Sequence, residues 1–221
     1  MPLLFVDLDN TLVDRAAAFA AWAAEYLDAR GADPALLDAM ITADGDGLRP
    51  KPEVRADITE LLGLSEDESA TLIDTLRAGA VSHLELATGA REGLIRARRD
   101  GWTICIATNG VEKQQQAKID KLRLAELVDG WVISEAVQAT KPDPEHFRLG
   151  AVFTEAEDDL AEAWHIGDSA EADIVGAHNA GLRSVWLARG REWPAHLEPP
   201  TAIADSFGEA IDVVLAGGRQ A

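Results

Sequence analysis

The chain has 221 residues, a hydrophobic fraction of 47% and a formal net charge of -19. This length suits one large domain or two small ones, and the acidic balance disfavours binding to nucleic acid or to an anionic membrane surface. A single cysteine excludes an internal disulfide framework. Neither a signal peptide nor an apolar run of membrane-spanning length is visible, so we expect a cytoplasmic protein.

A short apolar run, Leu3 to Val6, predicts a fully buried strand near the start of the chain. Two acids, Asp7 and Asp9, follow it with one leucine between them. Side chains two residues apart in an extended chain point the same way, which predicts both carboxylates at the carboxyl end of this strand. Open α/β sheets bind ligands at that edge, and paired carboxylates there need a divalent cation or a shared proton. The alternative is a strand running into a turn, because Asp, Asn and Thr all favour turns.

The segment from residue 14 to residue 87 shows no convincing strand and predicts an all-helical block. Its loop over 43–52 is rich in Gly, Pro and Asp, and it carries Arg49 and Lys51. These two cations suggest a specificity loop, although a solvated loop explains them equally well. Helices are expected over 13–30, from 33 through 40, over 53–62, and over 65–78 with a capping box at its start.

Helices and strands alternate from Gly89 onward, which predicts a parallel sheet built with right-handed crossovers. The first strand must join this sheet, because it cannot be stable alone. The helical block is therefore expected to be an insertion into the α/β core. Strands are expected over 102–107, 131–134, 164–167 and 184–188, and helices over 90–99, 111–122, 144–153, 170–179 and 207–215.

Polar side chains follow three of these later strands. Thr108 and Asn109 come after the second strand and can hold an oxyanion, although either also suits a helix cap. Lys141 precedes Pro-Asp-Pro and offers a positive charge for an anionic ligand, unless it is a solvated surface lysine. Asp168 and Asp173 follow the fourth strand and offer the hard oxygen donors that suit Mg²⁺.

Three other groups of reactive residues point less clearly to a site. The histidines lack metal-ligand spacing, and His165 is expected to be a core or edge residue of its strand. Cys105 lies in an apolar run and is expected to be a buried, inert thiol. Arg15 follows the first strand closely enough to reach a substrate there, although this is the less favoured interpretation.

Taken together, the strand-end motifs resemble those of the haloacid dehalogenase-like hydrolase superfamily. The resemblance covers essentially the whole chain. It implies a Rossmann-like, three-layer α/β/α core over residues 1–13 and 88–221, with an all-helical cap domain over 14–87 inserted after the first motif. The matching segments are Asp7-Leu8-Asp9-Asn10-Thr11, Ala107-Thr108-Asn109, Lys141-Pro142-Asp143-Pro144 and Gly167 through Asp173.

The resemblance implies a phosphatase that acts on phosphomonoesters through an aspartyl-phosphate. Asp7 would be the nucleophile, and Asp9 would be the general acid for the leaving alcohol and then the base that activates water. Thr108 and the amide of Asn109 would hold the phosphoryl oxygens. Lys141 would neutralise charge between the nucleophile and the phosphoryl group.

The resemblance also implies Mg²⁺ as the cofactor. Its ligands would be Asp7, the backbone carbonyl of Asp9, and Asp168. Asp173 would be a ligand through a water molecule, or would only orient the other ligands. The substrate would be a small phosphorylated metabolite, such as a nucleotide or a sugar phosphate. The protein would be a monomer or a homodimer.

Three alternatives stay open at this level. A phosphomutase of the same superfamily would use the same residues, and only cap chemistry and water exclusion separate it from a phosphatase. A haloacid dehalogenase is disfavoured by Asp9, because displacement at carbon needs no acid for an alcohol and those relatives generally lack this aspartate. A non-enzymatic binding module is disfavoured because Asp7, Asp9, Lys141 and Asp168 are all present.

Overall fold

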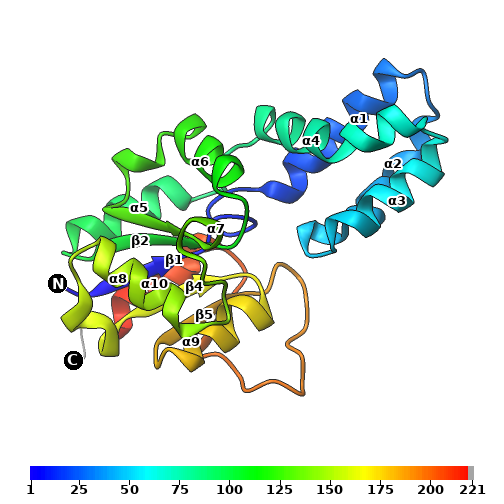
Figure 1. The fold of residues 1–221 in the computed structure, drawn as a ribbon. Coiled ribbons are helices and arrows are strands. Elements are labelled where there is room, and N and C mark those ends of the chain that lie inside the picture. The colour runs from blue at the N-terminus through cyan, green and yellow to red at the C-terminus, as the bar shows by residue number, and fades with distance from the viewer. Residues whose placement is uncertain (219–221) are drawn as a thin grey trace. The chain divides into compact units, whose positions relative to one another are not determined.

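The structure, a computed structural model, describes residues 1–218, without the side chains of residues 158 and 159. The chain forms two compact units. One unit combines Met1–Val13 with the chain from Leu86 onward, and the other is Asp14–Glu85. Figure 1 shows the ribbon of the described residues. No helix among them is both long and apolar enough to span a membrane.

The larger unit contains a six-stranded parallel sheet in the order β3-β2-β1-β4-β5-β6. Figure 1 labels the inner strands β2, β1, β4 and β5. β1 lies inside the sheet, and its four residues are buried, as a strand covered on both faces must be. The predicted parallel sheet is thereby confirmed, including the entry of the first strand into it. The strands are β1 (Leu3–Val6), β2 (Thr103–Thr108), β3 (Gly130–Ile133), β4 (Trp164–Gly167), β5 (Arg183–Leu187) and β6 (Ala202–Ala204).

Helices cover both faces of this sheet and complete the three-layer architecture. Phe5 of β1 points to the face where Phe147 of α8 and Ala177 of α9 pack. Strand residues alternate in direction, so Leu4 points to the opposite face. On that face α5 contacts α10, and these helices contact β2 and β5 respectively. The four helices are α5 (Ala90–Arg99), α8 (Pro144–Phe153), α9 (Gly176–Asn179) and α10 (Phe207–Gly217).

The connections hold the elements that the sequence analysis did not foresee. β6 is a three-residue edge strand that lies outside every predicted strand. The segment predicted as one helix over 170–179 is a π-helix, η5, followed by α9. The remaining connecting elements are α6 (Glu112–Lys121), η3 (Leu124–Glu126), α7 (Ser134–Val137), η4 (Glu157–Glu162) and η5 (Ala170–Val175).

The smaller unit is entirely helical, as predicted for this stretch. Its core joins Phe19 and Trp22 of α1 to Met40 of α2, together with apolar side chains of α3 and α4. Ser65 and Glu68 form the predicted capping box at the start of α4. The helical elements are α1 (Arg15–Ala29), η1 (Pro34–Leu36), α2 (Leu37–Asp44), η2 (Gly45–Gly47), α3 (Lys51–Leu62) and α4 (Glu66–Ser82).

Cations of the smaller unit pair with acids of the same unit. Arg15 is buried and binds Asp44, whose Oδ1 accepts from the Arg15 Nη2 at 2.7 Å. Arg49 donates to the Asp57 carboxylate at 2.6 Å and to the Ala43 carbonyl at 2.9 Å. Through these contacts, Arg15 joins α1 to the end of α2, and Arg49 joins the loop after α2 to α3.

Candidate active site

The predicted site residues lie around the centre of the sheet. The chain leaves β1 at Asp7 and β4 at Asp168, and β2 ends at Thr108. β2 and β4 are the two neighbours of β1, and all three strands run in the same direction. Their carboxyl ends therefore meet at one edge, next to the point where the strand order reverses. The sequence prediction of a shared strand-end site agrees with this topology.

The first motif turns sharply after β1. The backbone N–H groups of Leu12 and Val13 both donate to the Leu8 carbonyl, at 3.1 and 3.0 Å. Asn10 has a φ of 60°, a left-handed conformation that Asn tolerates better than most residues. This turn keeps the acids of the motif at the strand end and stops the chain from continuing as a strand.

Lys141 forms the centre of the charged cluster. Its Nζ lies 2.8 Å from Oδ1 of Asp7, 2.6 Å from Oδ1 of Asp173 and 2.5 Å from the Ala107 carbonyl oxygen. The side chain is only 1% exposed, so these three acceptors replace its hydration. The alternative of a solvated surface lysine is wrong.

The two carboxylates on Lys141 have opposite pKa shifts. Burial raises the pKa of Asp7 well above its ordinary value; Lys141 opposes this shift, and the charges of Asp173 and Asp168 add to it. Burial also acts to raise the pKa of Asp173, but Lys141 and a hydrogen bond from His165 hold it well below its ordinary value. Asp173 also has the shorter contact with Lys141, 2.6 Å against 2.8 Å for Asp7.

Asp173 is positioned by groups to which the sequence analysis gave no role in the site. His165 is fully buried on β4, and its Nε2 lies 2.9 Å from Oδ1 of Asp173. The Ser169 N–H donates to Oδ2 at 2.9 Å. Gly167 permits this approach, because a Cβ there would lie 2.3 Å from the Asp173 Cγ. His165 is a core residue, as predicted, but one that holds a site carboxylate.

Asp168 is bound by the loop that follows β5. Arg191 donates from Nη2 to Oδ2 of Asp168 at 3.1 Å and to its carbonyl oxygen at 2.7 Å. Arg189 adds a longer contact, 3.4 Å from its Nη1 to the same Oδ2. The Trp186 indole N–H also donates to the Asp168 carbonyl, at 2.8 Å. Two cations thus accompany a carboxylate that the sequence analysis placed in a metal site.

Asp7, Asp168 and Asp173 fit a divalent cation. One carboxylate oxygen from each lies within 4.8 Å of the others, and all three residues are buried. Such a set of hard oxygen donors suits Mg²⁺. Burial and mutual repulsion raise the pKa of Asp7, and a bound cation would relieve both. Three of the four predicted ligands therefore lie together through their side chains; the fourth, Asp9, was predicted to contribute its backbone carbonyl.

Thr108 and Asn109 occupy the end of β2. Thr108 is 1% exposed, and its Oγ1 accepts a hydrogen bond from Gln115 at 2.6 Å. Asn109 makes two hydrogen bonds with the backbone of Lys141: its Nδ2 donates to the carbonyl oxygen, and its Oδ1 accepts from the N–H, both at 2.9 Å. The Asn109 side chain thereby fixes the Lys141 loop to the strand end.

Asp9 lies among polar side chains of α6. Lys118 contacts both of its carboxylate oxygens, with Nζ 2.7 Å from Oδ1 and 2.6 Å from Oδ2. The Gln115 Nε2 donates to Oδ2 at 3.0 Å. Sequence reasoning missed Lys118 and Gln115, because α6 contains several lysines and glutamines and only tertiary packing distinguishes the buried ones.

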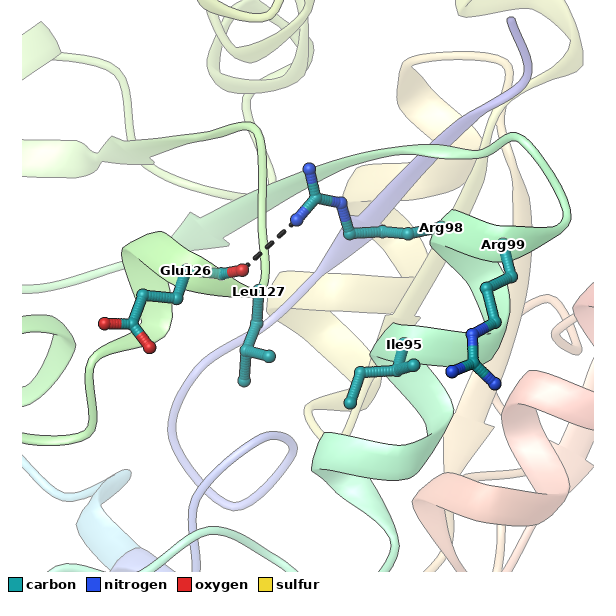
Figure 2. A pocket seen from close by; sticks show the side chains of 5 residues that line it. All are labelled: Ile95, Arg98, Arg99, Glu126 and Leu127. Atoms are coloured by element: carbon teal, nitrogen blue, oxygen red, sulfur yellow. Dashed lines mark hydrogen bonds between the residues drawn. The ribbon is translucent and has the colours of Figure 1, made fainter.

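A separate surface pocket of about 250 Å³ lies away from this edge. Figure 2 shows its lining, in which Arg98 donates to the Glu126 carbonyl oxygen at 3.2 Å. Arg98 lies at the end of α5, just before β2 begins, and Glu126 ends η3, just before β3. The pocket is therefore at the amino ends of the strands and is not part of the strand-end site. Its lining residues are Ile95, Arg98, Arg99, Glu126 and Leu127.

Known proteins with similar sequences include several phosphatases. A family model described as haloacid dehalogenase-like hydrolase matches residues 3–187. A phosphoglycolate phosphatase of Rhodobacter capsulatus is 31% identical over 96% of this chain and 96% of its own. A pyrimidine 5'-nucleotidase of Escherichia coli is 36% identical over 50% of this chain, and the matched part spans about half of that enzyme, 49%.

A solved structure gives the same assignment. The crystal structure of a HAD-hydrolase from Bacillus subtilis bound to magnesium superposes with a TM-score of 0.75. It is 25% identical and covers 96% of this chain and 98% of its own. The family match extends from β1 to the end of β5 and so includes every predicted site residue. The chain belongs to the haloacid dehalogenase-like hydrolase family.

Proposed function

We propose that this protein is a Mg²⁺-dependent phosphatase that hydrolyses a phosphomonoester of a small metabolite. The observation that carries the proposal is the buried cluster of Asp7, Lys141, Asp168 and Asp173 at the strand ends. A carboxylate attacks a phosphate dianion only where positive charge offsets their repulsion. Lys141 provides one such charge beside Asp7, and the three carboxylates provide a set of donors for a metal ion.

In the proposed reaction, Asp7 attacks phosphorus and the bond to the leaving oxygen breaks. Asp9 gives that oxygen a proton, so the product is an alcohol. Asp9 then takes a proton from water, which attacks the phosphorus of the aspartyl-phosphate and releases phosphate and free Asp7. Lys141 stays paired with Asp7 and offsets the charge of the transferred group. Mg²⁺, held by Asp7, Asp168 and Asp173 with the Asp9 carbonyl, would neutralise further phosphoryl charge when bound.

Thr108 and Asn109 would hold the phosphoryl oxygens. The Thr108 Oγ1 accepts from Gln115, and its own hydrogen makes only a long contact, 3.5 Å, with the Asn109 carbonyl oxygen. In the proposal this hydroxyl turns from that carbonyl to donate to a phosphoryl oxygen. The backbone amide of Asn109, just beyond the strand end, is the second proposed donor. Thr108 is the last residue of β2 and Asn109 follows it, and β2 is the strand next to β1.

We further propose that the helical unit, Asp14–Glu85, is a cap domain that selects the substrate. Its insertion directly after the Asp7 motif supports this role. Phosphoglycolate is the first substrate to test, because the relative that matches over nearly the full length of both chains is a phosphoglycolate phosphatase. A nucleoside monophosphate is the second, given the partial match to a 5'-nucleotidase. The cytoplasmic location and the monomeric or homodimeric state stay predictions.

The decisive experiment measures phosphate release from phosphoglycolate, nucleoside monophosphates, sugar phosphates and p-nitrophenyl phosphate. Each is assayed with Mg²⁺ and with a chelator. Asp7→Asn is expected to abolish release, and the exposed Asp205→Asn serves as a matched control. Release that persists in Asp7→Asn, or that is indifferent to chelation, would contradict the proposed mechanism. Isomerisation of a sugar phosphate without release would indicate a phosphomutase instead.

A further inference from the structure

Helix α6 buries two polar side chains beside the site. Gln115 is 1% exposed and Lys118 is 4% exposed, whereas Lys113 on the same helix lies in solvent. The two buried residues are three positions apart, so they share one face of the helix. Burying an ammonium group is costly unless a charged or strongly polar partner replaces its water. The position of Lys118 therefore depends on what it contacts.

That partner is the carboxylate of Asp9. Lys118 contacts both oxygens, at 2.7 and 2.6 Å, and Gln115 donates to one of them at 3.0 Å. Gln115 also donates to Thr108 at 2.6 Å, which ties the contact to the end of β2. The Asp9 side chain is still 25% exposed, so the contacts with Lys118 and Gln115 leave part of the carboxylate accessible.

We propose that Lys118, assisted by Gln115, is a positioning residue that fixes the Asp9 carboxylate for proton transfer to the leaving group. This inference rests on the proposed phosphatase function. Proton transfer needs the carboxylate oxygen within hydrogen-bond distance of the leaving oxygen. Asp9 lies within the turn after β1 and has two rotatable side-chain bonds. Three contacts from one helix restrict the orientation of its carboxylate.

The geometry of Gly110 supports this arrangement. Gly110 has a φ of 149°, and a Cβ built there would lie 3.0 Å from the Gln115 side chain. Its N–H donates to the Ser134 hydroxyl at 2.9 Å, which fixes the loop between β2 and α6. The loop thus brings α6 close enough for Gln115 to reach both Thr108 and Asp9.

The test compares two kinds of leaving group. An alkyl phosphate such as phosphoglycolate needs an acid for its alkoxide, whereas p-nitrophenolate leaves readily without one. Lys118→Met is expected to lower kcat/KM for the alkyl phosphate on the order of 100-fold, in the range for acid–base catalysis. The loss with p-nitrophenyl phosphate is expected to be at least about tenfold smaller. Lys118→Arg should restore much of the alkyl phosphate activity, and Lys113→Met is the control on the same helix.

A double-mutant cycle separates positioning from a structural role. In an Asp9→Asn background, Lys118→Met is expected to cause little further loss, because the group that it positions is gone. Equal losses on both substrates, or additive losses in the double mutant, would overturn the inference. Gln115→Met provides a second route if Lys118→Met fails to fold, with a smaller loss expected on the alkyl phosphate. A wild-type protein that releases no phosphate would overturn both the proposed function and this inference.

Discussion

Replacing Lys141 by methionine tests how the buried charges balance. The substitution keeps most of the side-chain length but removes the ammonium group from contact with Asp7, Asp173 and the Ala107 carbonyl. Removing one partner of a buried ion pair costs about 3–5 kcal/mol, because the remaining charge is left uncompensated. We therefore expect Lys141→Met to lower the free energy of unfolding by about that amount at pH 7 without metal.

The stability loss in Lys141→Met should depend on pH, and Asp173 determines in which direction. The pKa of Asp173 is held below its unfolded value, so its contribution to stability is present above about pH 4 and is lost as the pH falls further. Lys141 is a main cause of that low pKa, so the stability difference between wild type and Lys141→Met should narrow in acid. Mg²⁺ should stabilise the variant more than the wild type, because the remaining carboxylates lack their internal cation.

The assay is urea unfolding followed by tryptophan fluorescence. Every tryptophan except Trp22 lies in the larger unit, so the signal reports mainly on the unit that contains Lys141. Lys113→Met, at an exposed position, should change stability by less than about 0.5 kcal/mol. A Lys141→Met loss below about 1 kcal/mol at pH 7 would refute the reasoning, because it would mean that the cluster carries little uncompensated charge.

Two further predictions concern close packing near the site. Gly167→Ala should displace Asp173, because the new Cβ would lie 2.3 Å from its Cγ; overpacking costs about 1–3 kcal/mol, and Mg²⁺ affinity measured by calorimetry should fall as well. Cys105 should not react with a thiol reagent until the larger unit unfolds, since burial raises the pKa of its thiol and leaves it inaccessible. Rapid labelling of the native protein would contradict that burial.

The sequence predicts the sheet well because its strands are short apolar runs with sharp ends. β1 begins and ends where the run Leu3 to Val6 predicts. β6 escapes prediction, because three residues at a sheet edge carry too little hydrophobic pattern, and only pairing with β5 makes them a strand. The π-helix over Ala170–Val175 has the composition of an ordinary helix, so its extra residue per turn is invisible in the sequence.

The residues of the candidate site also include some that the sequence predicts and some that it does not. Asp7 and Asp168 directly follow β1 and β4, and a parallel sheet brings such residues together without further information. Lys141 and Asp173 lie farther along the connections after β3 and β4, beyond α7 and inside η5 respectively. Lys118 lies in the middle of a helix, where one of several lysines faces Asp9 only because of how α6 packs. The sequence therefore predicts the residues at strand ends and misses those whose orientation depends on helix packing.

The paired hydrogen bonds between Asn109 and the backbone of Lys141 have a consequence for how this site tolerates change. The side-chain amide of Asn109 bonds both the N–H and the carbonyl of Lys141. The end of β2 therefore holds the Lys141 backbone, whatever connection precedes the lysine. We therefore expect that small changes of length between α7 and Lys141 leave the ammonium group in place as long as Asn109 is kept. The charge balance around Asp7 and Asp173 would then stay constant while this connection varies.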